Sequence, residues 1–126
     1  MQIHESAENY LETILILQHR NGMVRSIDIA NELGFSKPSV SRALGLLKES
    51  GYVSTDNGGY VSLTQSGRQI AEKIYERHTL LTDMFVSLGV DEKTASADAC
   101  RIEHVISDAT FSALKKHFGQ KNKIDV

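Results

Sequence analysis

Three potential metal ligands follow one another at helical spacing near the C-terminal end of the sequence. Cys100, Glu103 and His104 stand at positions i, i+3 and i+4, so a helix would present all three on one side. Thiolate, carboxylate and imidazole groups all bind transition-metal ions. A small buried cysteine beside a solvated acid would show the same spacing. The motif by itself is therefore equally consistent with a metal site and with ordinary helix packing.

Further donors occur elsewhere in the chain. His78 lies beside the apolar stripe of a long predicted helix, and Asn9 and Glu12 lie one turn apart on the first predicted helix. Taken singly, these residues have ordinary structural explanations. A lone histidine is usually hydrogen-bonded in a core, and a run of glutamates is usually a solvated face. Taken together with the motif at 100–104, they would supply six donors from three helices.

The elements that must position these donors are helices. Apolar residues recur at three- and four-residue steps, which is the signature of amphipathic helices. Ser26, Ser36, Thr64 and Asp91 are expected to cap helix starts with their side-chain oxygens. The predicted helices cover residues 7–21, 26–34, 36–50, 64–89, 91–106 and 108–118. The polar stretch from residue 119 to 126 is expected to be frayed.

A β-hairpin is predicted between the third and fourth helices. Residues 52–54 and 60–63 alternate apolar with small or polar side chains, and Asp56-Asn57-Gly58-Gly59 between them favours a tight turn. Two short helices followed by a glycine-tipped hairpin are the parts of a winged helix-turn-helix. We therefore expect a mainly α chain. Residues 1–63 would form a winged helix-turn-helix DNA-binding domain with a two-stranded wing, and residues 64–126 an all-helical metal-binding and dimerisation domain.

The start of the third predicted helix has the character of a DNA-reading surface. A recognition helix enters the major groove with its N-terminal residues near the base edges, so that end should be small, polar or basic. Arg42 is suited to guanine and Lys37 to a phosphate. A capped, solvated helix start would look similar, but the order of helix, turn and wing favours DNA binding. The expected DNA-binding residues are Arg25, Ser36, Lys37, Pro38, Ser39, Ser41, Arg42, Lys48 and Asn57.

Composition sets limits on these interpretations. The chain has 126 residues and a net charge of −2, which argues against a protein that coats nucleic acid by bulk electrostatics. The longest aliphatic run, Ile14–Leu17, is too short to span a membrane, and the N-terminus lacks a signal-peptide pattern. The single cysteine suits a reducing compartment, so a cytoplasmic location is expected. No catalytic motif is present, and an enzyme is not expected.

The whole chain resembles the diphtheria-toxin-repressor family of metal-dependent regulators, in particular its short manganese-transport-regulator branch. The motifs that carry the resemblance are Ala7-Glu8-Asn9-Tyr10-Leu11-Glu12, Ser36-Lys37-Pro38-Ser39-Val40, Tyr75-Glu76-Arg77-His78 and Ala99-Cys100-Arg101-Ile102-Glu103-His104. The resemblance implies a homodimer that binds double-stranded operator DNA when a divalent metal is bound and represses genes for metal uptake. It also implies a set of primary metal residues: Asn9, Glu12, His78, Cys100, Glu103 and His104.

The donor set is a hybrid of two branches of that family. The iron branch also has cysteine at the place of Cys100, but it has methionine and arginine at the places of Asn9 and Glu12. The manganese branch has aspartate and glutamate at the places of Asn9 and Cys100, and it matches the other four. Thiolate favours Fe(II), Co(II) or Zn(II) over Mn(II), whereas carboxylates suit Mn(II) or Fe(II). We expect Fe(II), followed by Mn(II), with Co(II) or Zn(II) possible.

The resemblance also bears on a second site and on assembly. The ancillary site of the iron branch is expected to be absent, because Thr82 and Ser96 replace its carboxylate and histidine. The metal is expected to act as a clasp between the first helix and the fourth and fifth helices. Dimerisation is expected through the apolar faces of the last three helices, including Phe111, Leu114 and Phe118.

Two other functions remain open from the sequence. One is a metal-independent winged-helix regulator that senses an oxidant or small ligand through Cys100, for which a neighbouring histidine would be useful. The other is a winged-helix protein-interaction module with no role in DNA binding. Substitution of Cys100 tests the first, and substitution of Lys37 and Arg42 tests the second.

Overall fold

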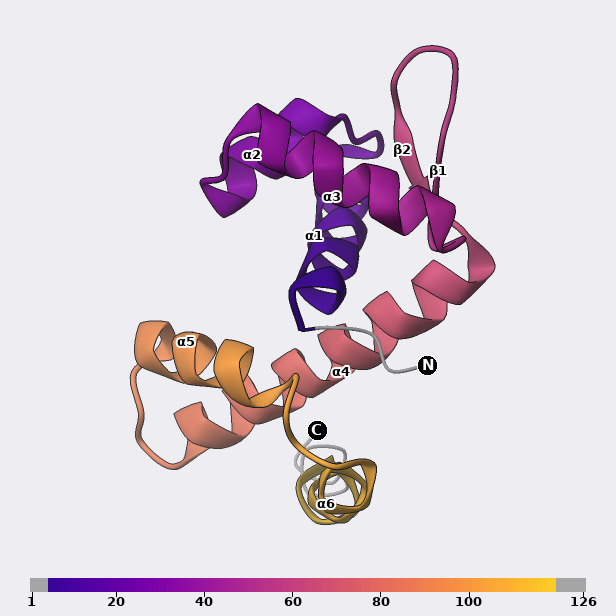
Figure 1. Cartoon of the computed structure of the whole chain (residues 1–126). Helices are drawn as coiled ribbons and strands as arrows, with labels where there is room; N and C mark the ends of the chain where they lie inside the picture. The colour runs from indigo at the N-terminus through magenta and orange to yellow at the C-terminus, as the bar shows by residue number, and fades with distance from the viewer. Residues whose placement is uncertain (1–4, 120–126) are drawn as a thin grey trace. The chain divides into compact units, whose positions relative to one another are not determined.

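The computed structural model describes residues 5–119, and the expected fraying of 119–126 falls almost wholly outside that range. The described chain is mainly helical, with one two-stranded sheet (Figure 1). It divides into two compact units, which meet in sequence between Lys73 and Ile74 inside the long helix α4. The elements are α1 (Glu5–Asn21), α2 (Ser26–Leu33), α3 (Lys37–Glu49), β1 (Val53–Thr55), β2 (Val61–Leu63), α4 (Gln65–Ser87), α5 (Glu92–Ile102), α6 (Asp108–Leu114) and the π-helical turn η1 (Lys115–Gly119).

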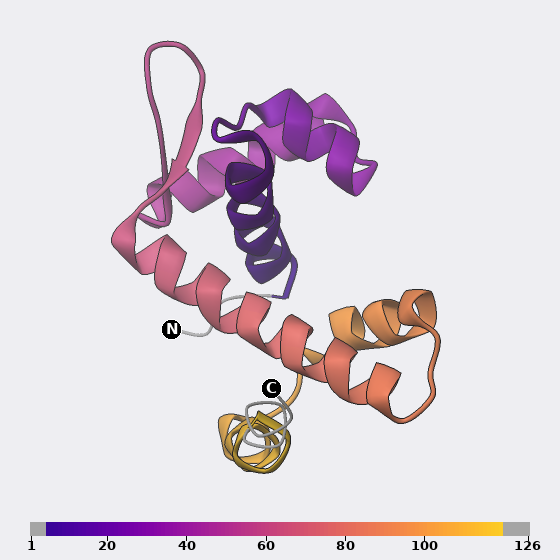
Figure 2. The same cartoon turned by 180° about the vertical axis from the view of Figure 1, so that it is seen from behind.

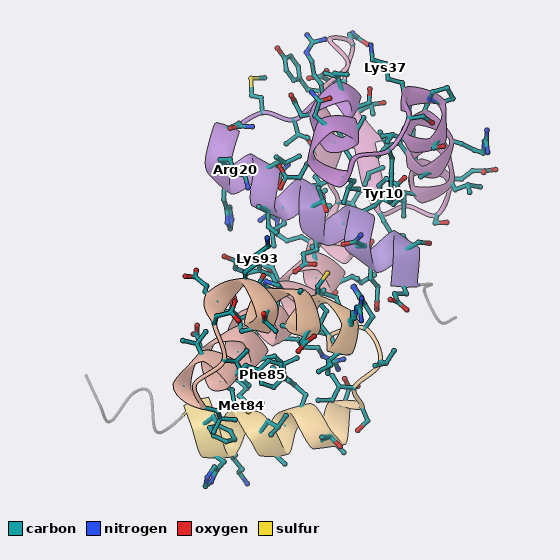
Figure 3. The ribbon with its side chains drawn as sticks, turned by 90° about the vertical axis from the view of Figure 1, so that its left-hand side faces the viewer. Tyr10, Arg20, Lys37, Met84, Phe85 and Lys93 are labelled. Carbon is teal, nitrogen blue, oxygen red and sulfur yellow. The ribbon has the colours of Figure 1, made fainter. Side chains whose placement is uncertain are left out.

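The first unit is built around α1. Its side chains at Leu11, Ile14 and Leu15 are almost completely buried and form one core with residues of α2, α3 and the hairpin. Helices α2 and α3 are joined by a sharp turn in which Gly34 has φ 71°, a left-handed conformation that ends α2. Tyr10 belongs to this core, whereas Lys37 lies on the outside of the unit (Figure 3). The predicted helix-turn-helix is confirmed.

One predicted helix cap is wrong. Ser26 is the first helical residue of α2, and the capping position belongs to Arg25, whose backbone is extended. The Asp28 carboxylate reaches back and accepts a hydrogen bond of 2.9 Å from the Arg25 backbone amide. The start of α2 is thus stabilised by a carboxylate at the third helical position and not by a Ser26 cap.

The wing is an antiparallel hairpin, as predicted, and it extends beyond the helices of its unit (Figure 2). Val53 pairs with Leu63, and Thr55 pairs with Val61. The Asp56 side chain closes the turn by accepting hydrogen bonds from two backbone amides farther along it. Arg25 adds an isolated bridge to Tyr60, so the residue before α2 pairs with the wing next to its turn.

Helix α4 starts directly after the wing. The Thr64 hydroxyl accepts a hydrogen bond from the Gly67 amide, which confirms the predicted cap, and it donates to the Gly51 carbonyl. Gly67 is packed against the backbone of Tyr52, so that an added Cβ would lie only 2.0 Å from the Tyr52 carbonyl oxygen. This position therefore accepts only glycine without a shift of the backbone.

The second unit contains the rest of α4 with α5, α6 and η1. Asp91 caps α5 as predicted by accepting a hydrogen bond from the Thr94 amide, and Thr94 holds the pKa of Asp91 below its usual range. The prediction that α5 continues to Ile106 is wrong, because the helix ends at Ile102 and is followed by a turn. Ser107 then caps α6.

Two further properties of the described residues bear on earlier expectations. Phe111 is buried within a single chain, so it is not available on the surface for the dimer contact that we predicted. Leu114 and Phe118 are only partly buried. Within residues 5–119, no helix is both long and apolar enough to cross a membrane.

Candidate metal centre and nucleic-acid interface

The buried carboxylate of Glu103 is the centre of the candidate metal site. Its side chain is 0% exposed, and its two oxygens face different histidines. Oε1 lies 2.7 Å from Nδ1 of His78 on α4, and Oε2 lies 3.6 Å from Nε2 of His104. One carboxylate therefore connects two imidazoles that come from separate parts of the second unit.

The Cys100 motif keeps its ligand geometry although the helix ends within it. Glu103 and His104 lie in the turn that follows α5, which corrects their expected position on one helix. Glu103 keeps helical dihedral angles, and its amide still donates to the Ala99 carbonyl, so the helical spacing continues through this residue. One ligand atom each from Cys100, Glu103 and His104 lies within 4.8 Å of the others. This separation is short enough for a single cation to contact all three.

The residues present suit a divalent metal ion. Among residues 5–119, Oε2 of Glu103 is a buried oxygen with no hydrogen-bond partner. Burial of a carboxylate is unfavourable unless a positive charge or a donor compensates it. A divalent cation would provide this charge. Thiolate, carboxylate and imidazole ligands together suit the softer divalent transition metals better than Ca²⁺ or Mg²⁺, which prefer oxygen ligands throughout.

His78 is held at both ring nitrogens. Besides the contact between Nδ1 and Glu103, its Nε2 lies 3.3 Å from the Ser96 hydroxyl on α5. Its side chain is 24% exposed, so the ring lies at the edge of the site rather than in the core. The Thr82 hydroxyl is buried and makes no hydrogen bond within the described chain. The positions that would form the ancillary site thus hold two hydroxyl groups, one of which orients His78.

The other two predicted donors belong to the first unit. Asn9 and Glu12 lie one turn apart on α1, where Asn9 is partly buried and Glu12 is buried. The backbone carbonyl of Asn9 accepts a hydrogen bond from the Thr13 hydroxyl. In the second unit the structure therefore brings Cys100, Glu103 and His104 together and sets His78 against Glu103. It places Asn9 and Glu12 on α1.

One residue beside the centre was missed by the sequence analysis. Arg77 precedes His78 on α4, is 5% exposed, and donates hydrogen bonds to the backbone carbonyls of Glu103 and Ile106. A signal was present, because Ile74 and Leu81 lie on the buried stripe of α4 and Arg77 falls between them at the same periodicity. A basic residue at a core position indicates a specific buried partner.

The predicted DNA-reading residues lie on the surface of the first unit. Lys37, Ser41 and Arg42 are exposed on the first turns of α3, and Pro38, the second residue of this helix, is exposed as well. Ser36 caps this helix by accepting a hydrogen bond from the Ser39 amide, so these two serines also have a structural role.

The remaining candidates either contact the wing or lie in it. The Arg25 guanidinium stacks on the Tyr60 ring at 4.3 Å from its centroid, and interaction with Tyr60 raises the pKa of Arg25 above its usual range. Lys48 donates a hydrogen bond of 2.8 Å to the Thr55 hydroxyl on β1. Asn57 is exposed in the wing turn. The predicted DNA-binding residues on α3 and in the wing turn are thus exposed.

A winged helix-turn-helix joined to a helical metal-binding unit defines a class of protein, the metal-dependent transcriptional regulators. Comparison with known families agrees with this class. Residues 2–61 match the iron dependent repressor N-terminal DNA binding domain, and residues 64–123 match the iron dependent repressor metal binding and dimerisation domain. The chain belongs to this family, the diphtheria-toxin-repressor family, and to its manganese-transport-regulator-like branch. It is a metal-dependent repressor of metal homeostasis, and its family consists of transcriptional regulators rather than enzymes.

Individual relatives cover most of the chain. It is 33% identical to the transcriptional regulator MntR of Escherichia coli O157:H7, over 94% of this chain and 76% of that protein. It is 34% identical to the uncharacterized HTH-type transcriptional regulator MJ0568 of Methanocaldococcus jannaschii, over 88% of this chain and 90% of that protein. These alignments extend across both units.

Solved structures show the same architecture. The manganese regulator SloR superposes with a TM-score of 0.75 at 26% identity, over 92% of this chain and 54% of SloR. A manganese-dependent transcriptional repressor in complex with manganese has a TM-score of 0.79 at 30% identity, over 90% of this chain and 52% of that chain. The chain therefore spans about half the length of these two regulators.

Proposed function

We propose that this protein binds operator DNA as a homodimer when Fe(II) or Mn(II) occupies the site around Glu103, and that it thereby represses genes for metal uptake. The observation that supports this proposal is the buried Glu103 carboxylate, whose two oxygens face His78 and His104. One ligand atom each from Cys100, Glu103 and His104 lies within 4.8 Å of the others. The proposed ligand set is Asn9, Glu12, His78, Cys100, Glu103 and His104. The proposal includes a cytoplasmic location, where operator DNA is accessible and a single thiol such as Cys100 stays reduced.

The proposed metal is Fe(II), with Mn(II) second. The Cys100 thiolate shifts the preference away from Mn(II), while the carboxylates of Glu12 and Glu103 retain affinity for hard ions. Co(II) and Zn(II) are expected to bind the same donors, since affinities for divalent ions rise along the series from Mn(II) to Cu(II) and remain high for Zn(II). The manganese named for the relatives keeps Mn(II) in the proposal.

The mechanism starts from the charges of the ligands. A bound divalent ion supplies the positive charge that compensates the buried carboxylate. We propose that Glu12 adds its carboxylate from α1, so that α1 is restrained when the site is filled. Because α1 forms the core of the unit that carries α3, this restraint limits how far apart the two recognition helices of a dimer can move. Recognition of adjacent major grooves requires a separation of about 34 Å.

The DNA contacts in this proposal follow the surface of the first unit. Arg42 would read a guanine edge, and Lys37 and the α3 serines would bind phosphates or bases. Arg25 before α2, Lys48 near the end of α3 and Asn57 in the wing turn would contact the phosphate backbone. Metal and DNA then bind cooperatively, each raising the affinity for the other by the same factor. Leu114 and Phe118 remain the proposed apolar contacts of the dimer.

Fluorescence anisotropy with operator DNA tests the proposal. The protein is titrated anaerobically onto DNA with Mn(II), Fe(II), Co(II) or Zn(II), and again with a chelator. We expect the chelator to weaken binding of the wild type by roughly tenfold or more, which corresponds to typical coupling between sites. Glu103→Gln should bind weakly with or without metal. Equal affinity with metal and with chelator, for wild type and Glu103→Gln alike, would overturn the proposal.

A second candidate function rests on the exposure of Cys100. An exposed thiol can respond to oxidants, so the chain could sense peroxide instead of a metal. Cys100→Ser separates the two functions. In the redox case a peroxide-dependent change in DNA binding disappears with this substitution, whereas in the metal case the substitution weakens metal-dependent DNA binding.

A further inference from the structure

Arg77 is a charged side chain in the core of the second unit. It lies on the buried stripe of α4 and is 5% exposed. Its Nη1 atom donates to the Ile106 carbonyl at 2.8 Å and to the Glu103 carbonyl at 3.1 Å. Its Nη2 atom pairs with the Asp108 carboxylate. A single guanidinium thus binds both ends of the turn between α5 and α6.

This turn carries two of the metal donors. Glu103 is the C-terminal cap of α5, and His104 follows it. The last carbonyls of a helix have no partner within the helix and bear partial negative charge, so a cation that binds them is stabilising. The planar guanidinium has donors at fixed angles and can hold two carbonyls and a carboxylate at once. It therefore fixes the backbone from which the Glu103 carboxylate projects towards His78.

The location of Arg77 argues against a purely space-filling role. An aliphatic side chain would continue the stripe formed by Ile74 and Leu81 without the desolvation of a charge. The Nε atom of Arg77 is buried with no hydrogen-bond partner among the described residues, which adds to that penalty. Phe111 covers the guanidinium, with its ring centroid 5.4 Å from the guanidinium carbon. A penalty of this kind is consistent with selection for a defined local structure rather than for stability.

We infer that Arg77 is a positioning residue of the metal centre, which holds the 103–106 turn in its ligand-ready conformation before any ion binds. The inference rests on the proposed function, because it takes Glu103 and His104 as ligands. Two adjacent residues of α4 then have separate roles. His78 is a metal ligand, and Arg77 holds the turn that carries the ligands Glu103 and His104. Outer residues that orient ligands in this way change metal affinity without touching the ion.

Co(II) titration of the full chain tests the inference. A Co(II)–thiolate charge-transfer band reports occupancy at Cys100. Arg77→Met should lower Co(II) affinity by roughly 10- to 100-fold. Arg77→Lys keeps the positive charge but loses the planar guanidinium with its donors at fixed angles, so this variant should also bind Co(II) more weakly. Asp108→Asn retains both carbonyl contacts and should have a smaller effect.

The matched control is Glu76→Gln. The ion pair between Glu76 and Lys115 joins α4 to η1 on the surface at 2.8 Å, and neither residue belongs to the 103–106 turn. This variant should bind Co(II) within about twofold of the wild type. A second measurement uses metal-free protein, in which Arg77→Lys should accelerate amide hydrogen exchange in residues 103–106 about tenfold, whereas Glu76→Gln should not.

The outcomes separate this inference from the proposed function. If Cys100→Ser and Glu103→Gln leave Co(II) binding unchanged, the proposed site is wrong. If those variants lose Co(II) binding while folded Arg77→Met binds it within twofold of the wild type, only the inference is overturned. Should Arg77→Met fail to fold by circular dichroism, Arg77→Lys decides the question. Wild-type affinity and wild-type exchange in that variant would overturn the positioning role.

Discussion

Nδ1 of His78 lies 2.7 Å from Oε1 of Glu103, although 25 residues separate them in the chain. The contact joins the middle of α4 to the turn after α5. It uses one oxygen of the buried carboxylate and leaves the other facing His104 at 3.6 Å. This arrangement makes Glu103 the residue on which the metal site depends most.

Substitution of Glu103 should remove the stabilisation that metal confers. Free metal at 100 times its Kd stabilises a protein with one site by about 2.7 kcal/mol. We expect a gain of that size for the wild type and of less than about 1 kcal/mol for Glu103→Gln, which keeps the shape but loses the charge. Urea unfolding with and without Mn(II) measures the difference, and Glu76→Gln serves as control. A full gain in Glu103→Gln would contradict the assignment.

Replacement of Cys100 should change which metals bind. Thiolate is a soft ligand, so its loss should weaken Zn(II) and Co(II) far more than Mn(II). For Cys100→Ser we expect at least roughly tenfold weaker Zn(II) binding and a change within a few-fold for Mn(II). Competition titrations with a metal-sensitive dye provide both affinities. Equal losses for the two ions would show that Cys100 does not set the preference.

Lys37 and Arg42 should differ in the DNA properties that they control. Lys37→Ala is expected to weaken binding to all DNA sequences. It should also reduce by about one the magnitude of the slope of the logarithm of the DNA-binding constant against the logarithm of the salt concentration. Arg42→Ala should cost about 1–3 kcal/mol on the operator and relax specificity at one position. Anisotropy titrations on operator and scrambled DNA at several salt concentrations separate the effects. Lys93→Ala, an exposed lysine on α5, is the control. Specificity unchanged in Arg42→Ala would refute its role in base reading.

Two glycines should respond to alanine in opposite directions. A Cβ at Gly67 would lie 2.0 Å from the Tyr52 carbonyl oxygen, so Gly67→Ala must displace α4 from the wing. We expect a loss of about 2–4 kcal/mol, within the range for severe strain. Gly45, on the exposed side of α3, has open space around it, and Gly45→Ala should gain about 1 kcal/mol. Urea unfolding of metal-free protein tests both, and equal stabilities would disprove the steric argument.

Most elements could be predicted from local patterns. The wing turn, the Ser36 cap and the Thr64 cap each depend on residues within a few positions, and the structure has all of them. The cap of α2 was misassigned by one residue, because the Asp28 carboxylate binds the Arg25 amide and the capping position falls at Arg25. The end of α5 was placed too late because the apolar periodicity continues to Ile106, while Arg77 captures the carbonyls of the following turn.

The sequence by itself determined the order of helices and wing, and the residue types from which a metal site could be built, because periodicity, caps and turn residues act over short distances. Tertiary structure alone decided that the two oxygens of Glu103 face different histidines. It also decided that the Arg77 side chain is buried against the turn that carries Glu103. These relationships depend on the packing of α4 against distant segments, and burial sets the strength of each charge interaction. No local pattern contains that information.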